Sequence, residues 1–426
     1  MPGAPRQLAR GALLVSIFVV MAAIGIAMLV YLGRHIGLTA LMIGMVAAMI
    51  PVPVLVFCFQ WLDRYEPEPI EYLVFCLSWG ATVAAGAALL LNQAALRRLH
   101  LPEAVIAVVC APFVEETMKA LGPLLLLVWR RRAFSGVVDG IVFCGLSATG
   151  FAMVENILYL GGYGYNVGTQ HGGVAGGVAQ FIGVFFVRIA LSGFAHPLFT
   201  AMTGIGLGVA ARAGSSRVRI LAPVAGWLTA MILHGSWNLM AELADQTKQV
   251  LILLYGYFSV MMPIFLGMVG FALWLRSWEG RLTQRILPEY VRAGWLSPPE
   301  VAALATMGRR QSARTWARRV AGDQGAQAMR GFQYAATRLA LLRDGLRRGL
   351  HPHGLDRAEA FAEERALLQA MSGYRTVFTG RDPQTPEAYW DGRRYHIRFP
   401  DGMVRDLDPP EQPVVPVPVA LVPYYR

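Results

Sequence analysis

Long apolar runs dominate the first 275 residues of the 426-residue chain, and they constrain its fold more than any other feature. A helix needs about 20 apolar residues to cross a bilayer, and each run reaches that length. Backbone groups inside lipid must be hydrogen-bonded within the segment, so such runs fold as helices. The eight runs lie near residues 11–32, 38–59, 70–95, 104–129, 136–160, 178–211, 219–241 and 250–275. We therefore predict an all-α polytopic membrane protein with about eight transmembrane helices, in which the overlong sixth run is tilted or broken near Pro197.

The distribution of basic residues predicts the orientation. Arginines cluster at residues 130–132, between the fourth and fifth runs, and at residues 212–219, between the sixth and seventh. With eight helices, these loops and both termini lie on one side, which the positive-inside rule assigns to the cytoplasm of a plasma or inner membrane. Arg97 and Arg98 fall on the opposite side and weaken this prediction. The net charge of +11 indicates contact of the cytoplasmic face with anionic lipid rather than binding of nucleic acid.

The composition changes after the last apolar run. We predict a transmembrane domain at residues 1–275, followed by a small, mainly helical cytoplasmic domain at residues 276–372, where apolar residues recur at helical spacing with arginines between them. Ser297, followed by two prolines and Glu300, is typical of a helix start. Residues 373–426 are rich in proline and are predicted to form a tail.

Two features of this C-terminal part are more specific. Residues 389–398 alternate between apolar and polar side chains, and the Pro-Asp-Gly at residues 400–402 follows them, so we predict one hairpin. Arginines also recur close to helical spacing at Arg309, Arg310, Arg314, Arg318 and Arg319. These side chains would suit anionic lipid headgroups or would simply form a solvated charged face, and the sequence leaves both readings open.

The fourth run contains Glu115, Glu116 and Lys119 near its middle. Even on a lenient scale, one charged side chain at the bilayer centre costs about 2.5–3.5 kcal/mol. An ion pair between Glu115 and Lys119, at i and i+4, would neutralise one acid but would leave the second unexplained. Adjacent carboxylates can share one proton, so this cluster would hold a base and an acid together. We therefore predict a chemical role for these three residues.

Glu155 and Asn156 form a second polar pair, in the fifth run. An isolated carboxylate near a helix end is commonly a snorkelling residue, but two neighbouring polar groups in lipid both need partners, which favours an internal site. Asp139 in the same run is closer to the basic loop and is interpreted as structural.

The two histidines deepest in apolar runs are His196 and His234. His196 lies near the middle of the sixth run, on the same drifting helix stripe as Arg188, and His234 lies in the seventh run with Asn238 at i+4 on the same face. A single histidine in an apolar helix is more often a packing residue, but two of them beside the acids favour a site. The candidate site residues, which four consecutive helices can bring around one cavity, are Glu115, Glu116, Lys119, Glu155, Asn156, His196, His234 and Asn238.

Two chemistries fit this set of residues. In the first, zinc or another divalent metal is held by the two histidines and a glutamate while another glutamate serves as general base, and the candidate ligands are His196, His234, Glu116 and Glu155. In the second, no metal takes part: a glutamate activates water, and histidine with asparagine stabilises the oxyanion. The HExxH spacing is absent, so the sequence leaves both chemistries open.

A transporter or channel is the alternative function, because polar residues at mid-membrane also line ion paths. No pair of matching broken helices occurs at equivalent places in two halves of the sequence, which weakens this alternative. A scaffold without catalytic activity would not need two histidines, two asparagines and several acids inside the bilayer.

These residues resemble the PrsW family of intramembrane proteases, which is similar to the CAAX prenyl protease and ABI group. The EExxK pattern matches Glu115 to Lys119, and FxxxEN matches Phe151 to Asn156. His196 and His234 look like the two histidine positions of the family, and the acidic loop at residues 63–69 looks like a further hallmark. The resemblance covers roughly residues 35–275.

One position departs from the family pattern. The HxxxD form is absent, because His196 is followed by Thr200 and His234 by Asn238, although asparagine also occurs there in CAAX protease relatives. The resemblance implies hydrolysis of peptide bonds in membrane-anchored protein substrates. It also implies a first, site-1 type cut in regulated proteolysis of a regulator such as an anti-sigma factor, by a metalloprotease or a glutamate-only mechanism.

Overall fold

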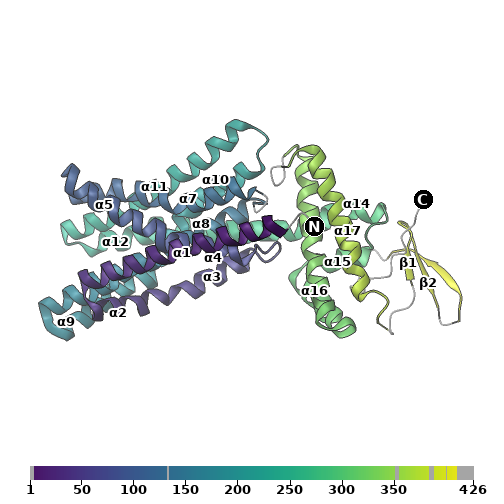
Figure 1. Ribbon diagram of the computed structural model, residues 1–426, viewed down its shortest axis with the longest axis horizontal. Helices are drawn as coiled ribbons and strands as arrows, with labels where there is room; N and C mark the ends of the chain where they lie inside the picture. The colour runs from purple at the N-terminus through teal and green to yellow at the C-terminus, as the bar shows by residue number, and fades with distance from the viewer. Residues whose placement is uncertain (1–3, 132–133, 351–354, 383–387, 400, 410–426) are drawn as a thin grey trace. The chain divides into compact units, whose positions relative to one another are not determined.

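The computed structural model describes residues 4–131, 134–350, 355–382, 388–399 and 401–409 (Figure 1). The chain forms two compact units. The first contains Met1–Asp63 and Glu68–Phe271, and the second contains Arg64–Pro67 and Ala272–Arg426. The chain therefore enters the second unit for four residues before it returns to the first.

The first unit is a bundle of helices. Its α-helices are α1 (Ala4–Ile36), α2 (Leu38–Met49), α3 (Pro51–Leu62), α4 (Ile70–Trp79), α5 (Ala85–Leu99), α6 (Glu103–Val105), α7 (Ala111–Trp129), α8 (Val137–Ile157), α9 (Val167–Phe185), α10 (Ala195–Arg212), α11 (Ser216–Thr247), α12 (Val250–Gly256) and the first part of α13 (Met262–Ile286). Short π-helical segments join several of them: η1 (Gly80–Ala84), η2 (Ile106–Cys110), η4 (Leu158–Asn166), η5 (Phe186–Leu191) and η6 (Tyr257–Met261).

Six helical stretches in the described part of the chain are long and apolar enough to cross a membrane. They are Ala12–Ile36, Leu38–Leu62, Ile70–Arg98, Val137–Arg212, Ser216–Thr247 and Val250–Arg292. The mainly helical, multi-pass character predicted from the sequence is confirmed, but the predicted number of eight is not. The reason is visible in Val137–Arg212, where the fifth and sixth apolar runs form one continuous stretch, and in α7, whose three ionisable residues lower its apolar character.

Two turns divide the long stretch at Val137–Arg212. The first falls inside α9, where Gly172 and Gly173 leave the helical conformation and Gly173 has a φ of 60°, a value that favours glycine. The second falls at residues 192–194, between η5 and α10. Pro197 then lies in the first turn of α10, where proline costs no helical hydrogen bond. The break expected near Pro197 is present, and it precedes the proline because a helix tolerates proline at its start.

Helix α8 lies at the centre of the first unit, and 18 of its 21 residues are buried. It packs against α10, α4, α2, α3 and α7. Its approach to α10 depends on small residues: a Cβ added to Gly140 would lie 2.0 Å from the carbonyl oxygen of Gly204. Close backbone contact of this kind is typical of helix pairs in membranes. The polar side chains of α8 therefore face other helices rather than lipid.

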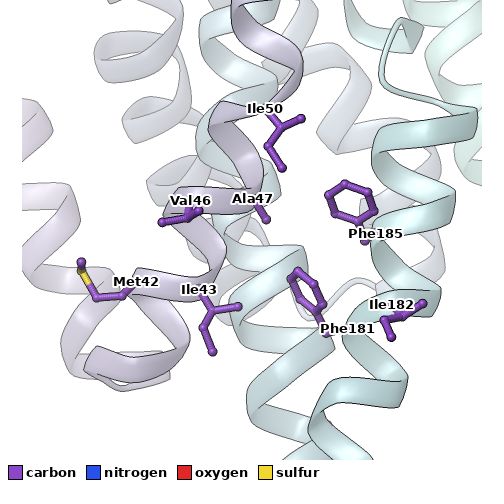
Figure 2. A pocket seen from close by; sticks show the side chains of 8 residues that line it. All are labelled: Met42, Ile43, Val46, Ala47, Ile50, Phe181, Ile182 and Phe185. Carbon is purple, nitrogen blue, oxygen red and sulfur yellow. The ribbon is translucent and has the colours of Figure 1, made fainter.

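A wholly apolar groove of about 520 Å³ lies between α2 and α9 (Figure 2). It is lined by Met42, Ile43, Val46, Ala47, Ile50, Phe181, Ile182 and Phe185. No ionisable group is among these lining residues, so the groove offers no chemistry of its own.

The second unit combines helices with a small sheet. Its elements are the end of α13, α14 (Pro288–Arg292), α15 (Pro298–Leu304), α16 (Met307–Arg347), α17 (Arg357–Phe378), β1 (Ala388–Trp390), β2 (Tyr395–Arg398) and β3 (Val404–Leu407). The strands form an antiparallel sheet in the order β1-β2-β3, with Trp390 opposite Tyr395 and Arg398 opposite Val404. The predicted hairpin corresponds to β2 and β3, and β1 adds a third strand; Pro400 and the tail from residue 410 lie outside the described residues.

Local signals in this unit explain its helices. Ser297 caps α15, with its backbone N–H donating to Glu300 Oε2 at 2.8 Å, as the sequence predicted. One prediction needs correction: Arg310 does not belong to a solvated basic face. It is buried, donates to the Leu304 carbonyl at 2.9 Å and to Thr337 Oγ1 at 2.8 Å, and stacks over the ring of Tyr65. Helical spacing alone could not show that α16 buries this side of its first turns.

Candidate active site

Helix α7 carries the two adjacent acids and the lysine. Lys119 is fully buried, and its Nζ lies 2.9 Å from Glu116 Oε1 and 3.3 Å from Glu115 Oε2. The i,i+4 pair considered from the sequence is present, but the same ammonium also contacts the second acid. The ring of Phe151 lies 4.0 Å below this ammonium and excludes solvent from it.

Glu116 is the inner carboxylate of the cluster and is fully buried. Its Oε2 accepts a hydrogen bond from Thr200 Oγ1 at 2.8 Å, and its Oε1 lies 2.9 Å from His234 Nδ1. An ionised carboxylate only accepts hydrogen bonds, so Nδ1 of His234 donates to it. The other ring nitrogen of His234, Nε2, is then left unprotonated, 3.9 Å from Glu115 Oε2.

His196 connects this cluster to the second acid pair. Its Nδ1 lies 3.0 Å from Lys119 Nζ, and its Nε2 lies 2.8 Å from Glu155 Oε2. Because an ammonium only donates, Nδ1 accepts and the Nε2–H donates to Glu155. Glu155 also receives a hydrogen bond from Arg188 Nη2, while Arg188 Nε donates to Asn156 Oδ1 at 3.0 Å.

A cavity of about 430 Å³ opens beside these groups. Among the described residues that line it are Glu115, Glu155, Arg188, His196 and Asn238, and most of the remaining wall is apolar. Glu116 and Lys119 lie behind Glu115 rather than on the cavity wall. A largely apolar cavity with a few convergent polar groups is the usual form of a binding or catalytic site.

The donor set fits a divalent metal once Nδ1 of His196, which accepts from Lys119 in this structure, is released. One ligand atom each from Glu115, His196 and His234 lies within 4.8 Å of the others, and all three residues are buried. Two histidines and one carboxylate are a common ligand set for catalytic zinc. The bond from His234 Nδ1 to Glu116 leaves Nε2 available, and such carboxylate support is typical of metal-binding histidines. The geometry thus groups the histidines with Glu115, whereas the sequence analysis named Glu116 and Glu155, which contact the histidines instead.

Every residue named from the sequence lies in or beside this cluster, except that Asn238 stands slightly apart. Its Nδ2 donates to the Ala107 carbonyl at 2.8 Å while the side chain lines the cavity. Asp139 makes its contacts outside the cluster: it accepts a hydrogen bond from the backbone N–H of Gly136 at 3.1 Å and caps α8. That arrangement agrees with the structural role expected for it.

Two contributors were not assigned to the site from the sequence. Thr200 occupies the position where the sequence departs from HxxxD, and its hydroxyl contacts Glu116 from the same face of α10 as His196. Arg188 was noted only as part of a helix stripe, yet it contacts both Glu155 and Asn156. Thr200 could have been found from its i+4 spacing to His196 on one helix. Arg188 could not, because the turn at residues 192–194 separates it from the helix of His196.

Comparisons with known proteins point to one family. Residues 68–268 match the sequence model described as PrsW family intramembrane metalloprotease. Protease PrsW of Clostridioides difficile (strain 630) is 25% identical over 213 residues, which cover 49% of this chain and 83% of that protein. Protease PrsW of Geobacillus kaustophilus (strain HTA426) is 28% identical over 198 residues, 46% of this chain and 79% of that protein. Protease PrsW of Bacillus subtilis (strain 168) is 26% identical over 194 residues, 45% and 79% respectively.

No solved structure matches the chain. The matched region begins before α4 and ends within α13, so it contains the whole cluster of buried acids and histidines. Over residues 68–268, the membrane unit of this chain is therefore similar to the PrsW family of intramembrane metalloproteases.

Proposed function

We propose that this protein is an endopeptidase that cuts membrane-anchored protein substrates in the cavity beside Glu115. The observation that carries the proposal is the placement of a carboxylate, a histidine and an amide on the wall of one largely apolar cavity: Glu115, His196 and Asn238. Hydrolysis of a peptide bond needs a base for water and a donor for the oxyanion, and these groups supply both. The family assignment replaces the alternative of a transporter or channel.

The hydrogen bonds favour different roles for the two acids. Glu115 faces the cavity and is the candidate general base, which takes a proton from water as the water attacks the scissile carbonyl and returns it to the leaving amine. Glu116 accepts from Thr200 and contacts Lys119 and His234, and it is fully buried behind the cavity wall, so it would orient its neighbours rather than contact substrate.

The histidines are poor donors to an oxyanion in this arrangement. His196 already donates its N–H to Glu155, and His234 donates its N–H to Glu116. The amide of Asn238 uses one of its two N–H groups for Ala107 and can direct the other at substrate. A metal held by Glu115, His234 and the Nδ1 of His196, in place of Lys119, would polarise the scissile carbonyl as a Lewis acid.

The physiological substrate follows from the family only in general terms. A membrane-anchored regulator such as an anti-sigma factor, cut at site 1, is the substrate class that we propose. We also propose that both termini are cytoplasmic and that the basic face contacts anionic lipid, since arginines gather in the loops assigned to that side. The apolar wall of the cavity would suit an unfolded, apolar stretch of a substrate helix.

The test uses purified full-length protein in proteoliposomes with candidate single-span substrates. Bound metal is measured first, and cleavage is then followed with and without a chelator. His196→Ala and His234→Ala should each lower the cleavage rate at least about 100-fold, the usual scale for a lost acid–base or orienting group. His171, which is exposed in α9, provides the matched control, and His171→Ala should cleave at the normal rate. Normal cleavage by His196→Ala, or equal damage from His171→Ala, would refute the proposed site.

A further inference from the structure

Arg188 is the second cation of the membrane cluster and is partly buried, and no motif used to recognise the site includes it. It lies on η5, in the helical segment that follows the turn at Gly172 and Gly173. Its side chain is 16% exposed and that of Glu155 is 18% exposed. Its guanidinium contacts Glu155 and Asn156 on one side and stacks on the ring of Tyr159, 4.1 Å away, on the other.

The charges of the cluster make this contact significant. Lys119 lies within 3.3 Å of both Glu115 and Glu116, so the third carboxylate, Glu155, depends on another cation. Arg188 is that cation in the described structure. A buried carboxylate without a partner is costly, and a planar guanidinium held by two acceptors and an aromatic ring fixes both the charge and the position of its partner.

The hydrogen bonds continue from Arg188 to the cavity. Glu155 Oε2 accepts from Arg188 and also from the Nε2–H of His196. This one oxygen and the ammonium of Lys119 therefore hold the His196 ring between them, with the proton on Nε2. The other nitrogen, Nδ1, then accepts from Lys119, which contacts both acids of α7.

We propose that Arg188 is a positioning residue for catalysis: it holds Glu155 so that Glu155 orients the His196 ring toward the cavity. The inference rests on the proposed function, since it assigns His196 to the reaction. Lysine should not replace Arg188 fully, because an ammonium cannot make the two-pronged contact with Glu155 and Asn156 or stack on Tyr159 in the same way.

The first arm of the experiment is kinetic. Arg188→Met should lower kcat about 100-fold, the scale expected for a misplaced reactive group, and should leave KM within about twofold; Arg188→Lys should fall between it and the unmodified protein. Glu155→Gln and the double variant that combines it with Arg188→Met complete a double-mutant cycle. Because Arg188 acts through Glu155, the double variant should cleave no more slowly than Glu155→Gln alone. Arg217→Met, at an exposed arginine in the first turn of α11, should have no effect.

The second arm does not depend on cleavage. Both ring nitrogens of His196 are engaged, so its carbethoxylation by diethyl pyrocarbonate, followed by mass spectrometry, should be slow. Arg188→Met and Arg188→Lys should accelerate this modification at His196 but not at the exposed His171. If the methionine variant does not fold, the lysine variant decides. The inference would be overturned if the reactivity of His196 did not change, if the activity were lost through a higher KM rather than a lower kcat, or if the effects of Arg188→Met and Glu155→Gln on the cleavage rate were additive. Absence of cleavage by the unmodified protein would instead count against the proposed function. The modification of His196 would then decide whether Arg188 positions that ring.

Discussion

Exchanging Glu115 and Glu116 of α7 for glutamine, one at a time, should distinguish a carboxylate that stabilises the fold from one that takes part in catalysis. Glu116 is fully buried and contacts three donors, Lys119 at 2.9 Å, His234 at 2.9 Å and Thr200 at 2.8 Å. Glutamine keeps one carbonyl oxygen and places an NH₂ group against donors that need an acceptor. Breaking a buried ion pair by removing one partner costs about 3–5 kcal/mol.

Glu115 should behave differently under the same change. Its contacts with the same two residues are longer, 3.3 Å to Lys119 and 3.9 Å to His234, and its side chain lines the cavity. The loss of one such hydrogen bond is worth about 1–1.5 kcal/mol. The two variants should therefore differ by about 2–3 kcal/mol in the free energy of unfolding, which corresponds to roughly 5–10 °C in Tm for a domain of this size.

The assay compares Tm and cleavage for each purified variant in the same detergent. A thiol-reactive dye can report unfolding, because Cys76 and Cys144 are buried while Cys58 gives a constant background. Both variants should lose at least about 100-fold in cleavage rate. Only Glu116→Gln should also show the large fall in Tm.

Thr200→Val and Glu242→Gln complete the series. The first removes one donor to Glu116 and should lower Tm by an intermediate amount. The second changes an acid of α11 that contacts Gln246, outside the cluster, and should leave both Tm and cleavage unchanged. Equal stability of Glu115→Gln and Glu116→Gln, or a lower Tm for Glu115→Gln, would show that Glu116 is not the inner, structural carboxylate.

Two further predictions concern the topology and the second unit. Cysteines introduced at Gly172 and Ser215, both exposed, should be labelled from opposite sides, Gly172 from outside the cell; labelling of both from one side would mean that the number of spans between them is wrong. In the sheet, hydrogen bonds from the backbone N–H of residue 394 and from His396 lower the pKa of Asp391 to about 2, and Asp391 and Asp406 raise the pKa of His396. The stabilisation from Asp391 is present above its unfolded pKa of about 3.9 and is lost as the pH falls toward 2, and that from His396 is present below its unfolded pKa of about 6.5 and is lost at higher pH. The protection factors of the strand amides, each taken against the intrinsic exchange rate at the same pH, should therefore be highest between about pH 4 and 6.5; protection that rises further above pH 7 would contradict the pairing.

Local properties of the sequence determined much of the fold. The length and hydropathy of each apolar run are enough to require a helix in lipid, because the backbone has no other way to form its hydrogen bonds there. The same argument selected the site residues, since an ionisable group in such a run needs a partner and usually a function. Glu115, Glu155, His196 and their neighbours were therefore found without a structure.

The path of the chain could not be derived in this way. Hydropathy does not show that the fifth run continues through η4 to a turn at Gly173, or that the sixth run breaks at residues 192–194. Glycine at a turn and glycine in a helix contact look alike in sequence: Gly173 adopts a left-handed conformation, whereas Gly140 is helical and lies against Gly204 of α10. Only the packing of neighbouring helices separates these cases.

Most of the residues that meet in the membrane could be selected from the sequence, but Thr200 and Arg188 were not, and the neighbours of each residue depend on how the helices pack. Successive residues of a helix point about 100° apart, so the adjacent acids on α7 point in different directions, although Lys119 and His234 lie near both of them. The packing of α10 and α11 places Thr200 and His234 against Glu116 and leaves Glu115 on the cavity wall. Arg188 reaches Glu155 across a turn that no helical periodicity spans. Roles within the cluster depend on these directions, which are set by contacts between helices distant in the sequence.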